Sequence, residues 1–247
     1  MKHTLYLLLF ILPICVLAQR PGKREEKPVS LGLTYSQLRE KLTVPPYGLT
    51  RIQALIKKIK SDNEDNEVLD LADYNSLSLR EKFTYNMIHA ESYSQNCDAT
   101  PEESDEDKKI FANLPDAFVE FAWSERQTKF FSGNRDSVIQ FMKESMGRTK
   151  RAGVNFKQAM LEINAKEMIP DIISTFRANK QVRDLDLLTV LMNLMKDNEY
   201  EPFLISGSYK KLYAPETSYK TYLHDSPGNE ELIIKRATDF YNGDKKK

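Results

Sequence analysis

The feature of this sequence that most constrains its fold is the spacing of its apolar side chains behind helix-start signals. Thr50 and Gln53 form a capping box, in which two side chains satisfy backbone groups of the first helical turn. Behind this box, apolar residues recur at steps of three and four, the period of one helix face: Ile52, Leu55, Ile56 and Ile59. Further capping boxes begin at Thr34 and Ser78. The pattern predicts an all-α fold.

The second half of the chain carries more helix patterns, and glycines are expected to end them. One helix is expected to include Phe118 and Phe131 and to end at Gly133, and the next is expected to end at Gly147. Residues 185–195 are apolar on most faces, which is typical of a helix buried by neighbours on several sides. We therefore expect stacked antiparallel helix pairs, that is, an α-hairpin array.

A faint internal repeat supports this architecture. Residues 168–174 match residues 200–206 at an offset of 32, because both contain a proline, an apolar pair and a serine. A proline at the first helical position, followed by an apolar stripe, resembles the helix pairs of HEAT-like α-solenoids. The resemblance covers residues 134–213, and its period is shorter than the ~40 residues usual in that family. It implies a stack of helix pairs in the C-terminal half.

Residues 1–18 have the features of an export signal. Lys2 supplies a positive start, and the apolar run over residues 4–17 is shorter than the ~20 residues that span a bilayer. Small or β-branched residues precede Gln19 at the −3 and −1 positions, so we expect cleavage there; lipidation of Cys15 is the alternative. The segment resembles the Sec signal peptides of exported bacterial proteins. This implies a periplasmic or secreted protein without a transmembrane anchor after signal removal.

The mature chain is expected to divide into four parts. Residues 19–31 are polar and contain two prolines, so they are interpreted as a flexible spacer. An N-terminal helical segment over 32–112 is followed by a C-terminal helical stack over 113–243, with a charged stretch marking the boundary. Residues 244–247 form a basic tail.

The composition excludes several classes of function. The 36 basic and 36 acidic side chains balance, so the chain has no electrostatic footprint for nucleic acid. The nine glycines are isolated and form neither a phosphate-binding loop nor a dinucleotide fingerprint, so no cofactor is expected. After signal removal His89 and His224 are the only imidazoles, and neither has the spacing of a zinc ligand set. His89 is expected at the surface or its boundary.

Catalysis remains as an alternative. Cys97 is the one cysteine of the mature chain, and with His89 or His224 it would form a nucleophile–base pair. The acidic residues that begin at Asp98 argue against a thiolate, because they raise the pKa of a neighbouring thiol. A pair of carboxylates brought together only in three dimensions is the other catalytic arrangement. Both describe a secreted or periplasmic hydrolase.

The most unusual local composition is a tyrosine- and lysine-rich stretch near the C-terminus. Tyrosine rings with basic neighbours suit a glycan, peptide or partner surface, where the ring binds and the hydroxyl stays hydrated. The residues are Tyr209, Lys210, Lys211, Tyr213, Tyr219 and Tyr222. The alternative is that these rings pack the end of the helical stack. Trp123 is expected in the core.

These observations favour binding over catalysis. No motif supplies a catalytic constellation or a metal site, and helical stacks commonly present binding surfaces. We expect a non-catalytic binding or scaffolding module, with a protein or glycan of the cell envelope as its partner.

Overall fold

The computed structural model describes residues 34–95, 104–179, 183–218 and 220–244. The predicted export signal, the spacer and residues 245–247 of the basic tail lie outside these ranges, as do Cys97 and Tyr219. The division of the mature chain at residue 112 stays a prediction.

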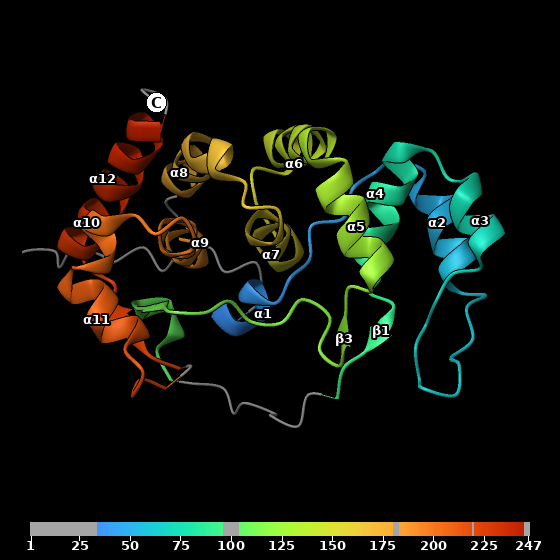
Figure 1. Ribbon diagram of the computed structural model, residues 1–247, viewed down its shortest axis with the longest axis horizontal. Coiled ribbons are helices and arrows are strands. Elements are labelled where there is room, and N and C mark those ends of the chain that lie inside the picture. Colours follow the sequence, from blue (N-terminus) through green and yellow to red (C-terminus); the bar gives the residue numbers. More distant parts are fainter. Residues whose placement is uncertain (1–33, 96–103, 180–182, 219, 245–247) are drawn as a thin grey trace, which may run out of the picture.

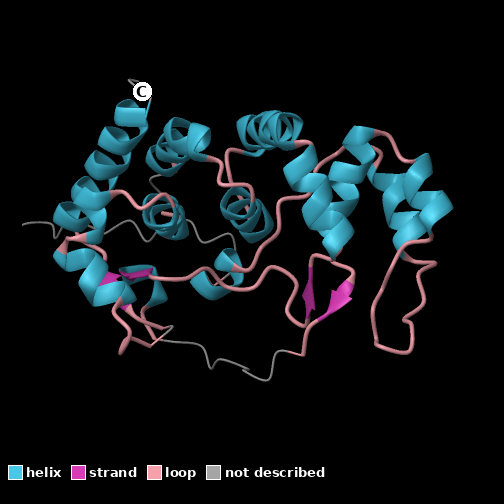
Figure 2. Ribbon diagram, in the orientation of Figure 1, coloured by secondary structure: helices cyan, strands magenta, loops and turns pink. Residues whose placement is uncertain are grey.

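Helices dominate the described residues (Figures 1 and 2), which confirms a mainly helical fold. In the N-terminal segment they are α1 (Tyr35–Arg39), α2 (Leu49–Ile56), α3 (Leu71–Ser76) and α4 (Leu79–Ile88). The following group comprises α5 (Glu125–Gly133), α6 (Arg135–Thr149), α7 (Val154–Glu162) and α8 (Ile169–Ala178). The last group comprises α9 (Asp186–Asp197), α10 (Glu201–Leu204), α11 (Gly207–Tyr213) and α12 (Pro227–Asp244).

Four short strands qualify the all-α prediction. Strand β1 (Ser92–Tyr93) pairs antiparallel with β3 (Phe121–Ala122). Strand β2 (Lys109–Phe111) pairs antiparallel with β4 (Tyr222–His224), and Ile110 lies opposite Leu223. Short 3-10 turns precede β2 (Glu106–Lys108) and α8 (Lys166–Met168). Each strand has only two or three residues, so the pairs join distant segments without forming an extended sheet.

Two of the three predicted capping boxes are confirmed. Thr34 caps α1 and Ser78 caps α4, each with the reciprocal side-chain hydrogen bond that defines the motif. The predicted box at Thr50 is wrong, because α2 begins at Leu49 and its N-cap is Gly48. Gly48 has φ 62°, a left-handed conformation that glycine adopts without strain, and a Cβ there would lie 2.6 Å from Cγ of Glu81.

The predicted helix ends at glycine need correction. The helix expected to include Phe118 begins only at Glu125, and the preceding segment contains β3. Gly133 is the last residue of α5, as expected. Gly147 lies inside α6, which ends at Thr149 and is followed by Lys150 in a left-handed conformation (φ 56°). The isolated glycine is thus tolerated within a helix, at a cost of about 1 kcal/mol relative to alanine.

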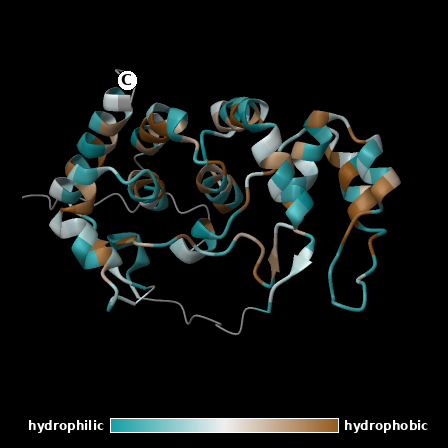
Figure 3. Ribbon diagram, viewed as in Figure 1, coloured by the Kyte–Doolittle hydropathy of each residue, from teal (hydrophilic) through white to brown (hydrophobic). Residues whose placement is uncertain are grey.

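Helix α9 is the centre of the larger hydrophobic core. All its residues from Asp186 to Met195 are buried, which confirms the prediction of a helix covered on several sides. Helices α7, α8 and α12 pack against it (Figure 1), and Figure 3 shows strongly hydrophobic residues on α7, α8 and α9. A smaller apolar cluster lies among α2, α3 and α4 and includes Ile52, Leu55 and Tyr74.

The extended segment between α1 and α2 is held against the start of α7. Gly153 N donates to Thr43 Oγ1 at 2.6 Å, and the Asn155 side chain both accepts from Thr43 N at 2.9 Å and donates to Thr43 O at 2.8 Å. Asn155 Nδ2 also donates to Met87 O at 2.6 Å, so one buried amide connects three segments. Only glycine fits at 153, because a Cβ would lie 2.1 Å from the backbone nitrogen of Thr43.

Candidate functional site

The first two tyrosines of the predicted binding stretch pack toward the core. Both Tyr209 and Tyr213 lie against the Phe203 ring, with centroids 5.6 and 6.3 Å away. The Tyr213 hydroxyl donates to Ala112 O at 3.0 Å, and burial raises the pKa of Tyr213 above its ordinary value. Neither ring is exposed, and these contacts favour packing of the helical stack over a ring surface open to a partner.

The remaining residues of that stretch lie on α11, on β4 and outside the described residues. The Tyr222 ring on β4 packs against Phe111, and Lys109 Nζ lies 4.6 Å from the Tyr222 ring centroid. Lys210 and Lys211 are exposed on α11, which contacts β4, and Tyr219 lies outside the described residues. A binding role for the six residues stays a prediction.

The two imidazoles lie in different surroundings. His89 follows the last residue of α4 and is only 7% exposed, so the expectation of a residue at the surface or its boundary is wrong. Its Nε2 donates to Glu67 O at 2.7 Å, which explains how a polar ring is accommodated there. His224 is exposed on β4, where its ring contacts Tyr222. The predicted pairing of either imidazole with Cys97 falls outside the described residues.

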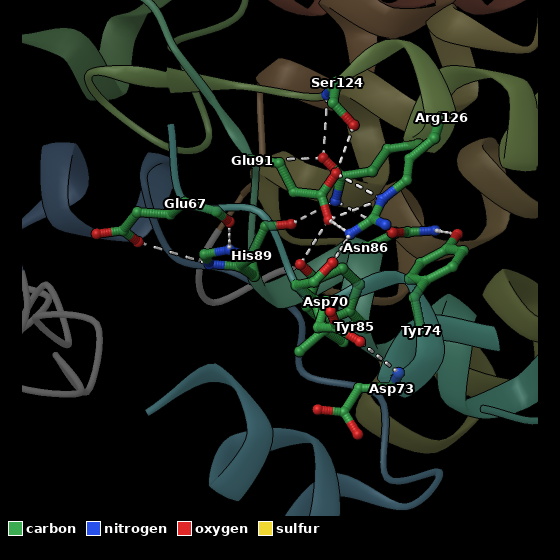
Figure 4. A network of polar contacts seen from close by, with 12 residues as sticks. Glu67, Asp70, Asp73, Tyr74, Tyr85, Asn86, His89, Glu91, Ser124 and Arg126 are labelled. Carbon is green, nitrogen blue, oxygen red and sulfur yellow. Dashed lines mark hydrogen bonds and ion pairs between the residues drawn. The ribbon is translucent and has the colours of Figure 1, made fainter. Parts of the chain in front are cut away.

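Glu91 is the centre of a buried polar network (Figure 4) that the sequence did not indicate. Its carboxylate is fully buried and accepts hydrogen bonds at 2.6 Å from both the Tyr85 and the Ser124 hydroxyls. Arg126 Nε donates to the same carboxylate at 2.9 Å. Burial alone would raise the pKa of Glu91, but the hydrogen bonds, above all those from Arg126, hold it below its usual value.

Amide side chains complete this network. Gln127 Nε2 donates to Asn86 Oδ1 at 3.0 Å and to His89 O at 2.8 Å, while its Oε1 accepts from Glu91 N at 3.1 Å. The Trp123 indole, partly buried against the core as predicted, donates to Asn86 O at 2.7 Å. Because each of these groups already has protein partners and Glu91 has no exposure, the network joins α4, β1 and α5 and is closed to a substrate.

A second buried cluster does bring two carboxylates together. Lys157 Nζ lies 2.6 Å from Asp184 Oδ1 and 3.6 Å from Asp186 Oδ2, and Arg39 Nη2 lies 3.1 Å from the other oxygen of Asp186. Burial raises the pKa of Asp184. Lys157 and Asp186 are almost fully buried, and the cations occupy the carboxylate oxygens. The cluster ties α1 to α7 and α9. Its carboxylates are largely buried and paired with cations, so they do not form an open site for a substrate.

A hollow on the described surface lies between α8 and α12. It encloses about 660 Å³, within the range of ligand sites in proteins. Four of its nine lining residues are aliphatic, namely Ile169, Pro170, Ile173 and Ala178, and five carry polar groups: Ser174, Arg177, Thr238, Tyr241 and Asn242. The sequence did not reveal this groove, because the helix period gives the apolar face of each helix but not which helix lies beside it.

Comparisons with known protein families, curated proteins and solved structures find no match. Within the described residues, no group of three or more His, Cys, Asp and Glu side chains is placed to hold a metal ion. None of the helices in the same ranges is both long enough and apolar enough to cross a bilayer. Function is therefore inferred from the geometry of the groove.

Proposed function

We propose that this chain is an exported, non-catalytic binding module of the cell envelope, and that a partner protein occupies the groove between α8 and α12. The observation that carries the proposal is the groove itself, a hollow of about 660 Å³ walled by Ile169, Pro170 and Ile173. Export is supported by the signal-like features of residues 1–18.

The architecture favours a groove that exists before binding. Both walls, α8 and α12, pack against α9, which is buried over almost its whole length. Elements anchored on one rigid core lose little conformational freedom when a partner binds, so more of the interaction energy contributes to affinity. A preformed groove of this kind is what a binding module requires.

We further infer that the helices around α9 form stacked antiparallel pairs, weakly similar to HEAT repeats. Packing of α9 against α7 and α8 supports this arrangement, as does the proline in the first turn of both α8 and α10. The second copy is short, because α10 ends at Leu204 and Ser206 caps a separate helix, α11. The stack then serves as a scaffold for the groove.

The lining suits a segment of polypeptide. Its apolar residues can cover apolar side chains of a partner, and the side chains of Ser174, Thr238 and Asn242 can form hydrogen bonds with peptide groups. An apolar segment of a protein gains roughly 25 cal/mol for each Å² of surface that it removes from water. We therefore expect a short segment of a partner protein, with apolar side chains directed toward α8 and α12.

Panning of a 12-residue peptide display library on the purified protein tests this proposal. Ser174 is exposed and lines the groove, so Ser174→Trp fills the hollow without removing a core contact. Ser132 is an exposed serine on α5 outside the groove, and Ser132→Trp is the matched control. We expect peptides that bind the wild type and the control at least tenfold more tightly than Ser174→Trp. Equal binding to all three proteins, or no enrichment at all, would refute the proposal.

A further inference from the structure

Arg177 stands at one end of the groove with an unused guanidinium group. Six other arginines of the described ranges form ion pairs: Arg39, Arg51, Arg80, Arg126, Arg135 and Arg183. Arg177 is exposed, and no hydrogen bond, ion pair or ring contact involves it in the described part of the chain. Its position in the last turn of α8 favours a cation through the helix dipole, but this leaves its N–H donors free.

No aspartate or glutamate is among the described residues that line the groove beside Arg177. The two acidic residues on the groove helices nearest to its lining are already paired: Asp171 with Lys143 at 3.0 Å, and Asp239 with Lys235 at 2.6 Å. The polar groups along the edges, such as Ser174 and Asn242, are neutral. The groove thus combines an apolar wall with one positive charge that lacks a counter-ion within the described ranges.

We propose that the partner segment carries an acidic side chain, and that Arg177 selects it by forming an ion pair at the end of the groove. This inference rests on the proposed function. A guanidinium presents two parallel N–H donors that match the two oxygens of a carboxylate, so the pair fixes orientation as well as charge. A charge beside apolar walls interacts more strongly than one in bulk water. Arg177 is thus the residue that determines specificity.

The geometry of α8 sets the spacing within the partner segment. Arg177 lies seven residues after Pro170, which is exposed in the first turn of α8, and at 1.5 Å per residue this is about 10 Å along the helix axis. An extended polypeptide advances about 3.3 Å per residue, so the same distance spans roughly three residues. Apolar side chains lying over Pro170 and Ile173 therefore place the acidic residue about three positions away from the first of them.

The experiment uses the most enriched peptide from the display library, synthesised with a blocked N-terminus and C-terminus so that its carboxylates are side-chain groups only. A second peptide replaces the acidic residue by its amide. Both are titrated against the wild type, Arg177→Gln and, as a matched control, Arg148→Gln, which removes an exposed arginine from the last turn of α6, outside the groove. Fluorescence anisotropy gives the dissociation constants.

We expect the acidic peptide to bind the wild type and Arg148→Gln at least fivefold more tightly than its amide, and we expect this preference to fall below twofold in Arg177→Gln. A preference that persists in Arg177→Gln would overturn the inference, as would equal binding of both peptides to the wild type. In either case, peptides that bind the wild type but not Ser174→Trp would still support the proposed function. Failure to obtain such peptides contradicts the proposed function itself.

Discussion

Replacing Gly153 by alanine tests how the extended segment around Thr43 is held to the helical core. The new Cβ would lie 2.1 Å from Thr43 N, 2.5 Å from Leu42 C and 2.7 Å from Lys41 O. All three are backbone atoms, so no flexible side chain can move to relieve the overlap, and ordinary contact requires a shift of more than 1 Å. The segment has to leave its position on α7.

The cost follows from the hydrogen bonds that this movement breaks. They are Gly153 N to Thr43 Oγ1, Val154 N to Lys41 O, and the two bonds between Thr43 and the Asn155 amide. A typical hydrogen bond contributes about 0.5–1.5 kcal/mol net. We therefore expect Gly153→Ala to lower the free energy of unfolding by about 2–6 kcal/mol.

Gly147→Ala is the matched control. Gly147 lies inside α6, and the position that a Cβ would take there has no neighbouring atom within 4 Å, so alanine should stabilise the helix by about 0.5–1 kcal/mol. Urea unfolding followed by circular dichroism at 222 nm measures both changes. Two results would contradict this reasoning. One is a decrease of less than about 1 kcal/mol in the free energy of unfolding of Gly153→Ala. The other is a decrease in Gly147→Ala as large as that in Gly153→Ala.

Three further predictions concern other parts of the chain. Glu91→Gln leaves the Arg126 guanidinium without its buried counter-ion and should cost about 3 kcal/mol in urea unfolding; a change of a few tenths would contradict the network. Hydrogen bonds, chiefly from Arg80, hold the pKa of Glu144 at about 2 instead of 4.5. The stabilisation by Glu144 is thus complete above pH 4.5 and lost as the pH falls through 2. The difference in urea midpoint between the wild type and Glu144→Gln should therefore shrink as the pH falls over that range. A difference that stays constant would contradict the lowered pKa of Glu144. Mass spectrometry of the protein from the periplasm or medium should find Gln19 at the N-terminus, and an intact leader would contradict the predicted cleavage.

Local signals in the sequence were sufficient for most helices. The apolar run over residues 185–195 predicted the buried helix α9, because a helix covered on all sides needs no polar face. Thr34 and Ser78 predicted helix starts, because their capping boxes depend only on neighbouring residues. The capping box predicted at Thr50 is wrong because α2 already begins at Leu49, after a glycine N-cap that has no side chain to indicate a helix start.

Features that depend on distant contacts were not predictable in this way. Strand β2 has three residues and no alternation long enough to detect, and its partner β4 is more than a hundred residues away. The burial of Glu91 could not be predicted, because nothing near it in the sequence indicates Arg126 as its partner. The groove likewise requires α12 to lie beside α8, which is a property of the tertiary packing.

The pairing of β2 with β4 has a consequence for synthesis of the chain. Ile110 is fully buried in the finished fold, but its opposite neighbour Leu223 is made more than a hundred residues later. At about 5–20 residues per second, the ribosome leaves an interval on the order of ten seconds between them. During that time the apolar strand β2 has no pairing partner in the nascent chain. We therefore expect a factor that binds nascent chains to protect this strand until β4 has been synthesised.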